Sequence, residues 1–220
     1  MIPGAVRRRS GPPYEVPTAS PYNAPTYCDL PTYDNTGSGL HFSAVDMHNE
    51  IGKDWNGWRY WAAFTPYYQQ DDRLENPSII VSSDGWHWVV PRGVINPIYG
   101  PPANPILWNA DTDLAYDPAS DTLVLAYQGQ REGLWLAQDQ LTARSVDGVR
   151  WPPVGWTAGM LSAYSRCASA SVFHDADGSW LMYAVYTGGG GGSGVRQMRR
   201  WRAAHATGPW LGEGEVTSGL

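Results

Sequence analysis

The sequence contains only two cysteines and three phenylalanines, and it has no run of 18 apolar residues. Two cysteines build neither a disulfide framework nor a four-ligand zinc site, so Cys28 and Cys167 either form one long-range bridge or stay free. Without a long apolar run we expect no membrane insertion. Residues 1–17 carry three arginines but no apolar region after them, which predicts that no secretory signal peptide is present.

Positive charge is also scarce. The chain has 15 Lys and Arg residues against 21 Asp and Glu residues, which gives a formal net charge of −6 at pH 7. A negative chain is not attracted to nucleic acids or to anionic membranes, so neither is expected as a partner. The 25 Gly and 18 Pro residues argue against long helices. By contrast, 12 Trp and 13 Tyr residues can fill a core between short strands.

A unit of about sixty residues occurs three times. The pattern Ser-x-Asp-Gly-x-x-Trp spans residues 82–88 and again 145–151, which start 63 positions apart (145 − 82). A weaker third copy ends at Trp210, where Gly208 lies 60 positions after Gly148 (208 − 148). Such a fixed period is typical of a repeat architecture.

The rest of each unit has the same order of elements. A strand-like segment leads through a tight-turn signal to a short apolar run, and a further strand precedes the Trp turn. The segments before the turns are 42–48, 111–117 and 169–174, and the apolar runs are 60–64, 123–127 and 180–185. We therefore predict an all-β, β-propeller-like fold with about three recognisable blades at 39–92, 106–152 and 160–212, with room for a fourth strand in the linkers.

The first 38 residues differ from the remainder. They are rich in Pro and Tyr, which favours extended backbone without its own core. We predict an extended N-terminal arm at 1–38, ordered against a partner or the propeller, and a propeller-like domain at 39–220. Because propellers typically have four to eight blades, the open edges are expected to be covered by other chains or by copies of this chain.

Carboxylates mark the candidate catalytic site. The innermost strands of a propeller line its central channel, and here they carry Asp46, Asp111 and Asp113. Paired carboxyl groups are what glycosidic-bond cleavage requires. The third blade offers Ser169 and its neighbours instead of an acid, and Glu75 is a more remote candidate. Alternatively, Asp46 caps a turn, and Asp111 and Asp113 bond to local backbone.

Aromatic residues in the predicted loops are candidate ligand-binding groups, because aromatic rings stack on the apolar faces of sugars. These residues are Trp55, Trp58, Tyr67 and Tyr99, with Asp113 beside them as a polar contact. The five histidines show no metal-ligand spacing, and their expected role is structural. Asp111 and Asp113 offer oxygen ligands to a Ca²⁺ ion, but two carboxylates alone do not make a site, so no cofactor or metal is predicted.

The residues also resemble a family. Segments 45–67, 75–85, 96–98 and 109–116 look like a propeller module of bacteriophage tail proteins. More distantly, the chain is similar to five-bladed propeller glycoside hydrolases of the arabinanase and invertase type. That resemblance implies a base at Asp46 and an assisting carboxylate at Asp111. It also implies a glutamic acid where Ala168 or Ser169 stands.

These observations lead to one functional prediction with two alternatives. We expect a non-catalytic component of a phage tail tip or fibre, located in the virion outside the cell, that recognises a host cell-surface glycan through a propeller face. Its partners would be other tail proteins or copies of itself. The alternatives are a glycoside hydrolase acting on host polysaccharide and a purely structural tail protein.

Overall fold

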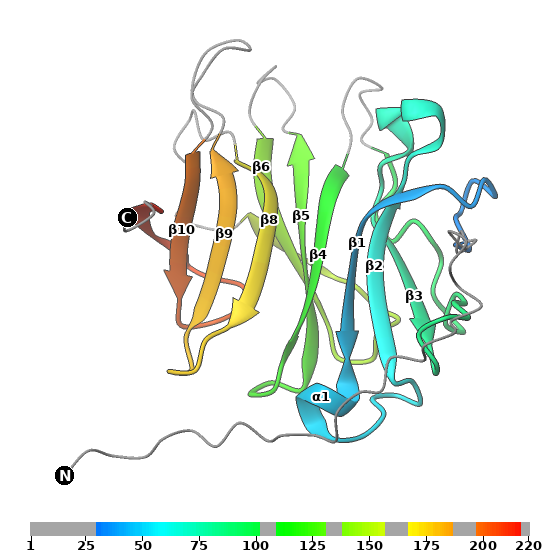
Figure 1. Ribbon diagram of the computed structural model, residues 1–220, viewed down its shortest axis with the longest axis horizontal. Helices are drawn as coiled ribbons and strands as arrows, with labels where there is room; N and C mark the ends of the chain where they lie inside the picture. Colours follow the sequence, from blue (N-terminus) through cyan, green and yellow to red (C-terminus); the bar gives the residue numbers. More distant parts are fainter. Residues whose placement is uncertain (1–29, 102–108, 131–137, 157–166, 187–196, 217–220) are drawn as a thin grey trace, which may run out of the picture.

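The computed structural model describes residues 30–101, 109–130, 138–156, 167–186 and 197–216. Three antiparallel sheets stand side by side, and each is built from one continuous part of the chain (Figure 1). The first sheet has the order β1-β2-β3. Its strands are β1 (Gly39–Asp46), β2 (Tyr60–Pro66) and β3 (Ser78–Ser82).

The other two sheets have four strands each, in the orders β4-β5-β6-β7 and β11-β10-β9-β8. The second sheet comprises β4 (Asn109–Asp117), β5 (Thr122–Gln130), β6 (Gln138–Ser145) and β7 (Pro153–Trp156). The third comprises β8 (Cys167–His174), β9 (Trp180–Tyr186), β10 (Gln197–Ala203) and β11 (Leu211–Glu215). Each sheet is therefore a propeller blade that starts with its inner strand: β1, β4 or β8.

The all-β, propeller-like class is confirmed. A fourth strand was predicted to be possible in the linker segments. It is present as β7 in the second blade and as β11 in the third, whereas the first blade has only an isolated bridge between Val81 and Val89. The division at residue 38 and the blade bounds stay predictions. Residues 1–29, including Cys28, and the side chain of Cys167 lie outside the described part of the chain, so their pairing stays open.

Helical structure in the described ranges is short, as the composition predicts. It consists of α1 (Met47–Ile51) and the 3-10 turns η1 (Tyr68–Gln70) and η2 (Asp72–Leu74). The strand expected at 42–48 ends at Asp46, because its carboxylate accepts a hydrogen bond from His48 N and caps α1. No helix in these ranges is long and apolar enough to cross a membrane.

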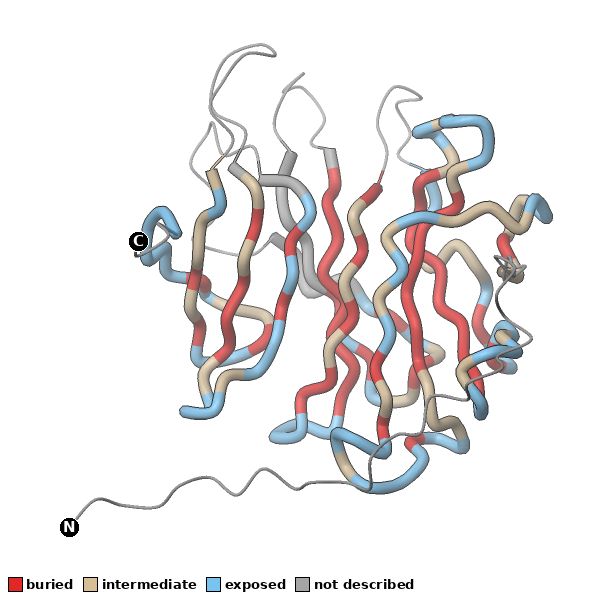
Figure 2. Tube along the Cα trace, in the orientation of Figure 1, coloured by how far each residue is buried: buried red, intermediate tan, exposed pale blue. Residues whose placement is uncertain are grey.

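Apolar side chains fill the spaces between neighbouring blades. One core cluster includes Trp61, Met47 and Leu125 between the first and second blades, and another includes Met182 and Trp210 at the third. Figure 2 shows β2 and β5 buried along most of their length. Burial of this kind is the main favourable contribution to folding.

The repeated Ser-x-Asp-Gly-x-x-Trp turn has a structural role. Ser145 Oγ accepts from Gly148 N at 2.8 Å, and Asp147 accepts from the next two backbone N–H groups, both at 2.8 Å. Trp151 Nε1 then donates to Gly148 O at 3.0 Å. The first copy repeats this set of contacts between Ser82, Asp84 and Trp88. Local hydrogen bonds thus explain the motif without a ligand.

One carboxylate ties the three inner strands together. Asp113 of β4 accepts a hydrogen bond from Ser43 Oγ of β1 at 2.6 Å and from Val172 N of β8, also at 2.6 Å. Ser43 Oγ in turn accepts from Leu114 N at 3.0 Å. Burial raises the pKa of Asp113 although these hydrogen bonds act in the opposite direction.

Asp113→Ala is expected to destabilise the chain by about 3 kcal/mol, because it leaves two partly buried donors without an acceptor. Ser43→Ala leaves Asp113 its hydrogen bond from Val172 N but removes the acceptor of Leu114 N, and it should cost about 1–2 kcal/mol. Urea unfolding of both single variants and of the double variant measures these values. Because the two side chains share one hydrogen bond, the effects should not add, and simple additivity would contradict the link.

Candidate functional site

The three inner strands carry the same irregularity near their first residues. The pairing of each inner strand with its neighbour shifts register between Leu40 and Ser43, between Ala110 and Asp113, and between Ala168 and Ser171. Inside each shift one residue adopts a φ of 51°: His41, Asp111 or Ser169. Positive φ in a residue other than Gly is uncommon, and such bulges often direct side chains at functional sites.

The three bulge residues meet around Asp111. His41 Nε2 lies 2.9 Å from Asp111 Oδ1. Asp111 Oδ2 accepts from Ser169 N at 2.7 Å and from Ser169 Oγ at 3.2 Å. Thr112 Oγ1 donates to His41 O at 2.8 Å and holds the first bulge against β4. One side chain from each blade therefore contributes to a single cluster.

Glu75 lies behind this cluster. It follows η2, and its backbone carbonyl accepts from Asn109 N at 3.0 Å, which fixes it beside the start of β4. Glu75 Oε1 lies 3.8 Å from His41 Nδ1, which also contacts Thr65 Oγ1 at 3.3 Å. The side chain of Glu75 is 7% exposed, whereas those of His41 and Asp111 are 32% and 12% exposed. The imidazole thus stands between two carboxyl groups.

The two carboxyl groups have opposite pKa shifts. Burial raises the pKa of Glu75 to about 7; His41 lowers it only in part, and Asp111 adds to the rise. Burial also acts to raise the pKa of Asp111, but hydrogen bonds from His41 and Ser169 outweigh it, and the net pKa is lowered. The hydrogen bond to Asp111 raises the pKa of His41 against the effect of burial. The cluster therefore holds one firmly ionised carboxylate, Asp111, and one carboxyl group, Glu75, that titrates near neutrality.

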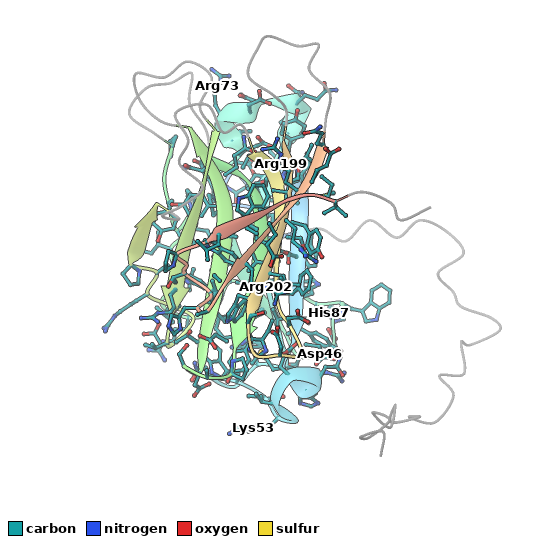
Figure 3. All side chains as sticks on the ribbon, turned by 90° about the vertical axis from the view of Figure 1, so that its left-hand side faces the viewer. Asp46, Lys53, Arg73, His87, Arg199 and Arg202 are labelled. Atoms are coloured by element: carbon teal, nitrogen blue, oxygen red, sulfur yellow. The ribbon has the colours of Figure 1, made fainter. Side chains whose placement is uncertain are left out.

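The structure does not bring Asp46 and Asp111 together, and this corrects the expectation of a shared pocket. Asp46 lies at the opposite end of β1 from His41, near Lys53 and far from Arg73 (Figure 3). Its carboxylate accepts from Arg59 Nε at 3.0 Å and from Arg59 Nη2 at 2.9 Å. Asp46 is thus held as an ion pair and helix cap, which is the local role that the sequence left open.

His41 was expected to be structural, and sequence reasoning missed its place in the cluster. The position of His41 in the repeat could have indicated this role. His41 is the third residue of β1, Asp111 is the third residue of β4, and Ser169 is the third residue of β8. Ser169 does stand at the blade-three position assigned to it, whereas the side chain of Ala168 lies outside the described part.

Most of the candidate aromatic residues do not form an exposed platform. Trp55 is 5% exposed and donates from Nε1 to Asp121, and Trp58 packs partly buried against the same core. Tyr99 stacks on the ring of Tyr127, and its hydroxyl donates to a backbone carbonyl. These three residues pack between blades, which corrects the expectation that they lie free in loops.

Tyr67 remains accessible in part. It follows β2 and is half-buried, and its backbone N–H donates to Ser38 O at 3.1 Å. A ligand-binding role for Tyr67 stays a prediction. Within the described ranges, no group of three or more His, Cys, Asp or Glu side chains is arranged to hold a metal ion.

Comparison with known proteins identifies one relative by sequence and several proteins with a similar fold. No family model matches the sequence. Over 160 residues the chain is 34% identical to an "A type blood N-acetyl-alpha-D-galactosamine deacetylase" of Flavonifractor plautii, a match that covers 70% of this chain and 20% of that protein. This chain therefore spans about a fifth of the length of that relative.

Solved structures show the same fold. An N-acetylgalactosamine deacetylase from F. plautii, in complex with blood group B trisaccharide, superposes with a TM-score of 0.73 at 24% identity and covers 88% of this chain and 58% of its own. An α-L-arabinofuranosidase from Fusarium graminearum gives 0.62 at 13% identity (80% and 50%). A family 117 glycoside hydrolase from Zobellia galactanivorans gives 0.56 at 15% identity (80% and 55%).

The chain thus has the propeller fold found in glycoside hydrolases, and the distant similarity to such enzymes is confirmed. The relatives named above are enzymes that act on carbohydrates, and they lend no support to the phage tail resemblance. At these identities the structural matches establish the fold alone.

Proposed function

We propose that this chain carries a hydrolytic site for a carbohydrate substrate, in which Asp111, His41 and Glu75 move the protons. The observation that supports this most directly is the opposite pKa shift of two carboxyl groups on either side of one imidazole. At neutral pH Asp111 is ionised and can accept a proton, while Glu75 is about half protonated and can supply one. Acid–base catalysis requires this division of roles.

Hydrolysis adds water across a bond, with the hydroxyl group going to the carbon and a proton going to the leaving atom. Asp111, which lies beside the exposed Ser169, is the group placed to take the proton from the attacking water. Glu75 can return a proton to the leaving group through His41, whose ring is more accessible than either carboxyl group. The bulges hold Asp111 and His41 on rigid strands rather than on loops.

Two bonds are candidates for cleavage. The relative at 34% identity is named as a deacetylase of N-acetylgalactosamine, which favours removal of an acetyl group from an N-acetylhexosamine. The two carboxyl groups in different protonation states favour the second candidate, cleavage of a glycosidic bond. Both reactions belong to a glycan-directed enzyme and release different products.

The test is to incubate the chain with oligosaccharides that end in N-acetylgalactosamine and to measure released acetate and new reducing ends separately. Asp111→Asn and Glu75→Gln should each lower kcat/KM by at least about 100-fold, since each removes a proton-transfer group. Asp71→Asn changes a partly exposed carboxylate that pairs with Arg73, and it should leave the rate unchanged.

Either product would identify the bond that is cleaved. A folded chain that releases neither product, or an Asp111→Asn variant as active as the parent, would contradict the proposal. Glycan binding without turnover in the same assay would instead favour the non-catalytic recognition role. The tail location and the tail partners predicted from the sequence remain predictions that this assay does not address.

A further inference from the structure

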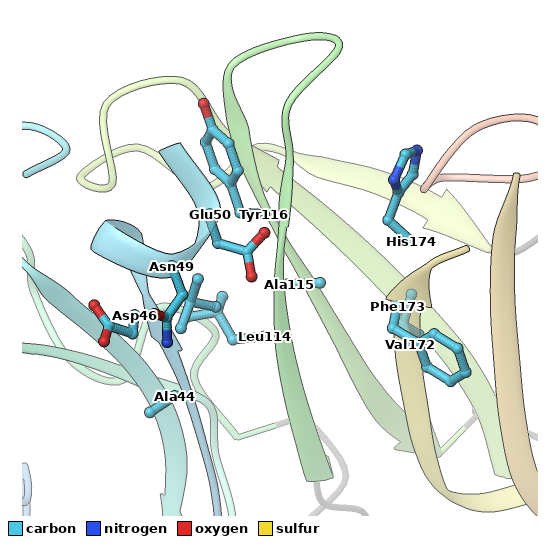
Figure 4. A pocket seen from close by; sticks show the side chains of 11 residues that line it. Ala44, Asp46, Asn49, Glu50, Leu114, Ala115, Tyr116, Val172, Phe173 and His174 are labelled. Carbon is cyan, nitrogen blue, oxygen red and sulfur yellow. The ribbon is translucent and has the colours of Figure 1, made fainter. Parts of the chain in front are cut away.

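A second cavity lies at the other end of the inner strands. Its volume is about 380 Å³, and its walls come from β1, α1, β4 and β8 (Figure 4). Along β4, Asp111 belongs to the first site and Tyr116 lines this cavity. Leu114, Ala115 and Tyr116 lie three to five residue steps beyond Asp111, which corresponds to roughly 10–16 Å. One monosaccharide cannot reach both places, so the cavity is distinct from the site described above.

Polar groups in this cavity are available to a ligand. Among the described residues, none forms a hydrogen bond or ion pair with the side chains of Asn49, Glu50 or His174. In Figure 4, Glu50 extends from α1 toward β4, Asn49 points down between Asp46 and Leu114, and His174 lies on the far side of Ala115. By contrast, Asp46 is bound to Arg59 and the Tyr116 hydroxyl donates to Asp121. A carboxylate, a carboxamide and an imidazole therefore remain free for hydrogen bonding.

The chemistry of these groups defines the ligand. The carboxylate of Glu50 only accepts hydrogen bonds, whereas Asn49 and His174 can donate as well as accept. A complementary ligand carries several hydroxyl or amino groups. Leu114 and Ala115 supply an apolar surface that suits the C–H face of a sugar ring. Its volume lies in the range of cavities that take small ligands.

The charge of the cavity further limits the class of ligand that can bind there. Arg59 neutralises Asp46, so Glu50 leaves the cavity with one uncompensated negative charge. A ligand with its own carboxylate would be repelled, while a neutral or amine-bearing ligand would not. We infer that this cavity is a second saccharide-binding site, specific for a neutral or amino sugar and separate from the hydrolytic site.

Binding of methyl glycosides tests the inference without any catalytic readout. The probes are methyl galactoside, methyl galactosaminide and methyl galacturonoside, titrated into the ¹⁵N-labelled chain. The neutral and amino sugars should shift the amide signals of Ala115 and Glu50, and the acidic sugar should bind about ten-fold more weakly. Asp111→Asn should leave these shifts unchanged, which separates this site from the hydrolytic one.

Glu50→Ala and His174→Ala should each weaken binding of the amino sugar by about ten-fold, as expected for a lost hydrogen bond to a charged or strongly polar group. Asp71→Ala removes a partly exposed acid outside this cavity and serves as the control. The inference is overturned if no probe shifts Ala115 or Glu50, if Glu50→Ala and His174→Ala bind like the parent, or if Asp111→Asn abolishes the shifts.

Discussion

Gly148→Ala is expected to destabilise the chain by on the order of 3–5 kcal/mol, whereas Gly85→Ala should cost only about 1 kcal/mol. Both glycines occupy the same position of the repeated turn, with φ of +72° and +79°, so the backbone strain of the substitution is similar. The neighbours differ. A Cβ at Gly148 would lie 2.1 Å from the ring of Trp61, while one at Gly85 would lie 3.6 Å from Tyr60.

The ring of Trp61 has no room to move away. It is 1% exposed, donates from Nε1 to Trp55 O at 3.1 Å and packs against the Trp55 ring. The clash therefore adds overpacking to the strain. Urea unfolding of the two variants side by side measures the difference. Equal losses at Gly85 and Gly148 would show that the turn conformation alone determines the cost.

Glu75→Gln should make the stability of the chain less sensitive to pH. The pKa of Glu75 is about 7 in the folded chain against an ordinary value of 4.5, so the folded state holds its proton more tightly than the unfolded state. This contribution is fully present below pH 4.5 and is lost as pH rises through 7. The shift corresponds to about 3 kcal/mol. Glutamine cannot ionise, so the variant escapes this loss.

The measurement is the free energy of unfolding of parent and variant in urea between pH 4.5 and 8. The difference between the two should move in favour of the variant by about 3 kcal/mol over this interval. Asp71→Asn provides the control, because hydrogen bonds from Arg73 lower the pKa of Asp71 and keep it ionised throughout. A parent-to-variant difference that is independent of pH would mean that Glu75 is not protonated in the folded chain near neutrality.

The parts of the fold that depend on local chemistry could be predicted from the sequence. The Ser-x-Asp-Gly-x-x-Trp pattern marks turns whose hydrogen bonds are all within the turn, and these two turns follow β3 and β6. The apolar run at 60–64 lies within β2 because branched and aromatic residues suit a buried strand. These signals need no knowledge of distant residues.

The candidate site could not be predicted in the same way, because it depends on tertiary contacts that local sequence patterns do not encode. Asp46 and His41 belong to the same inner strand. The sequence alone does not indicate which end of that strand lies beside the cluster. The raised pKa of Glu75 comes from burial, which arises only when η2 packs beside β4. Trp55 and Tyr99 looked like loop residues, yet they are covered because the neighbouring blade lies over them.

The repeated bulge has a consequence for how such a site can diversify. Duplication of one blade copies the left-handed position along with the strands, so every added blade brings one more side chain to the same cluster. His41, Asp111 and Ser169 occupy the equivalent position of the three blades and carry three different side chains. The surrounding hydrogen bonds of the strands involve backbone atoms and tolerate such exchange. A protein built in this way can acquire a new chemistry through one substitution per blade while its scaffold is inherited intact.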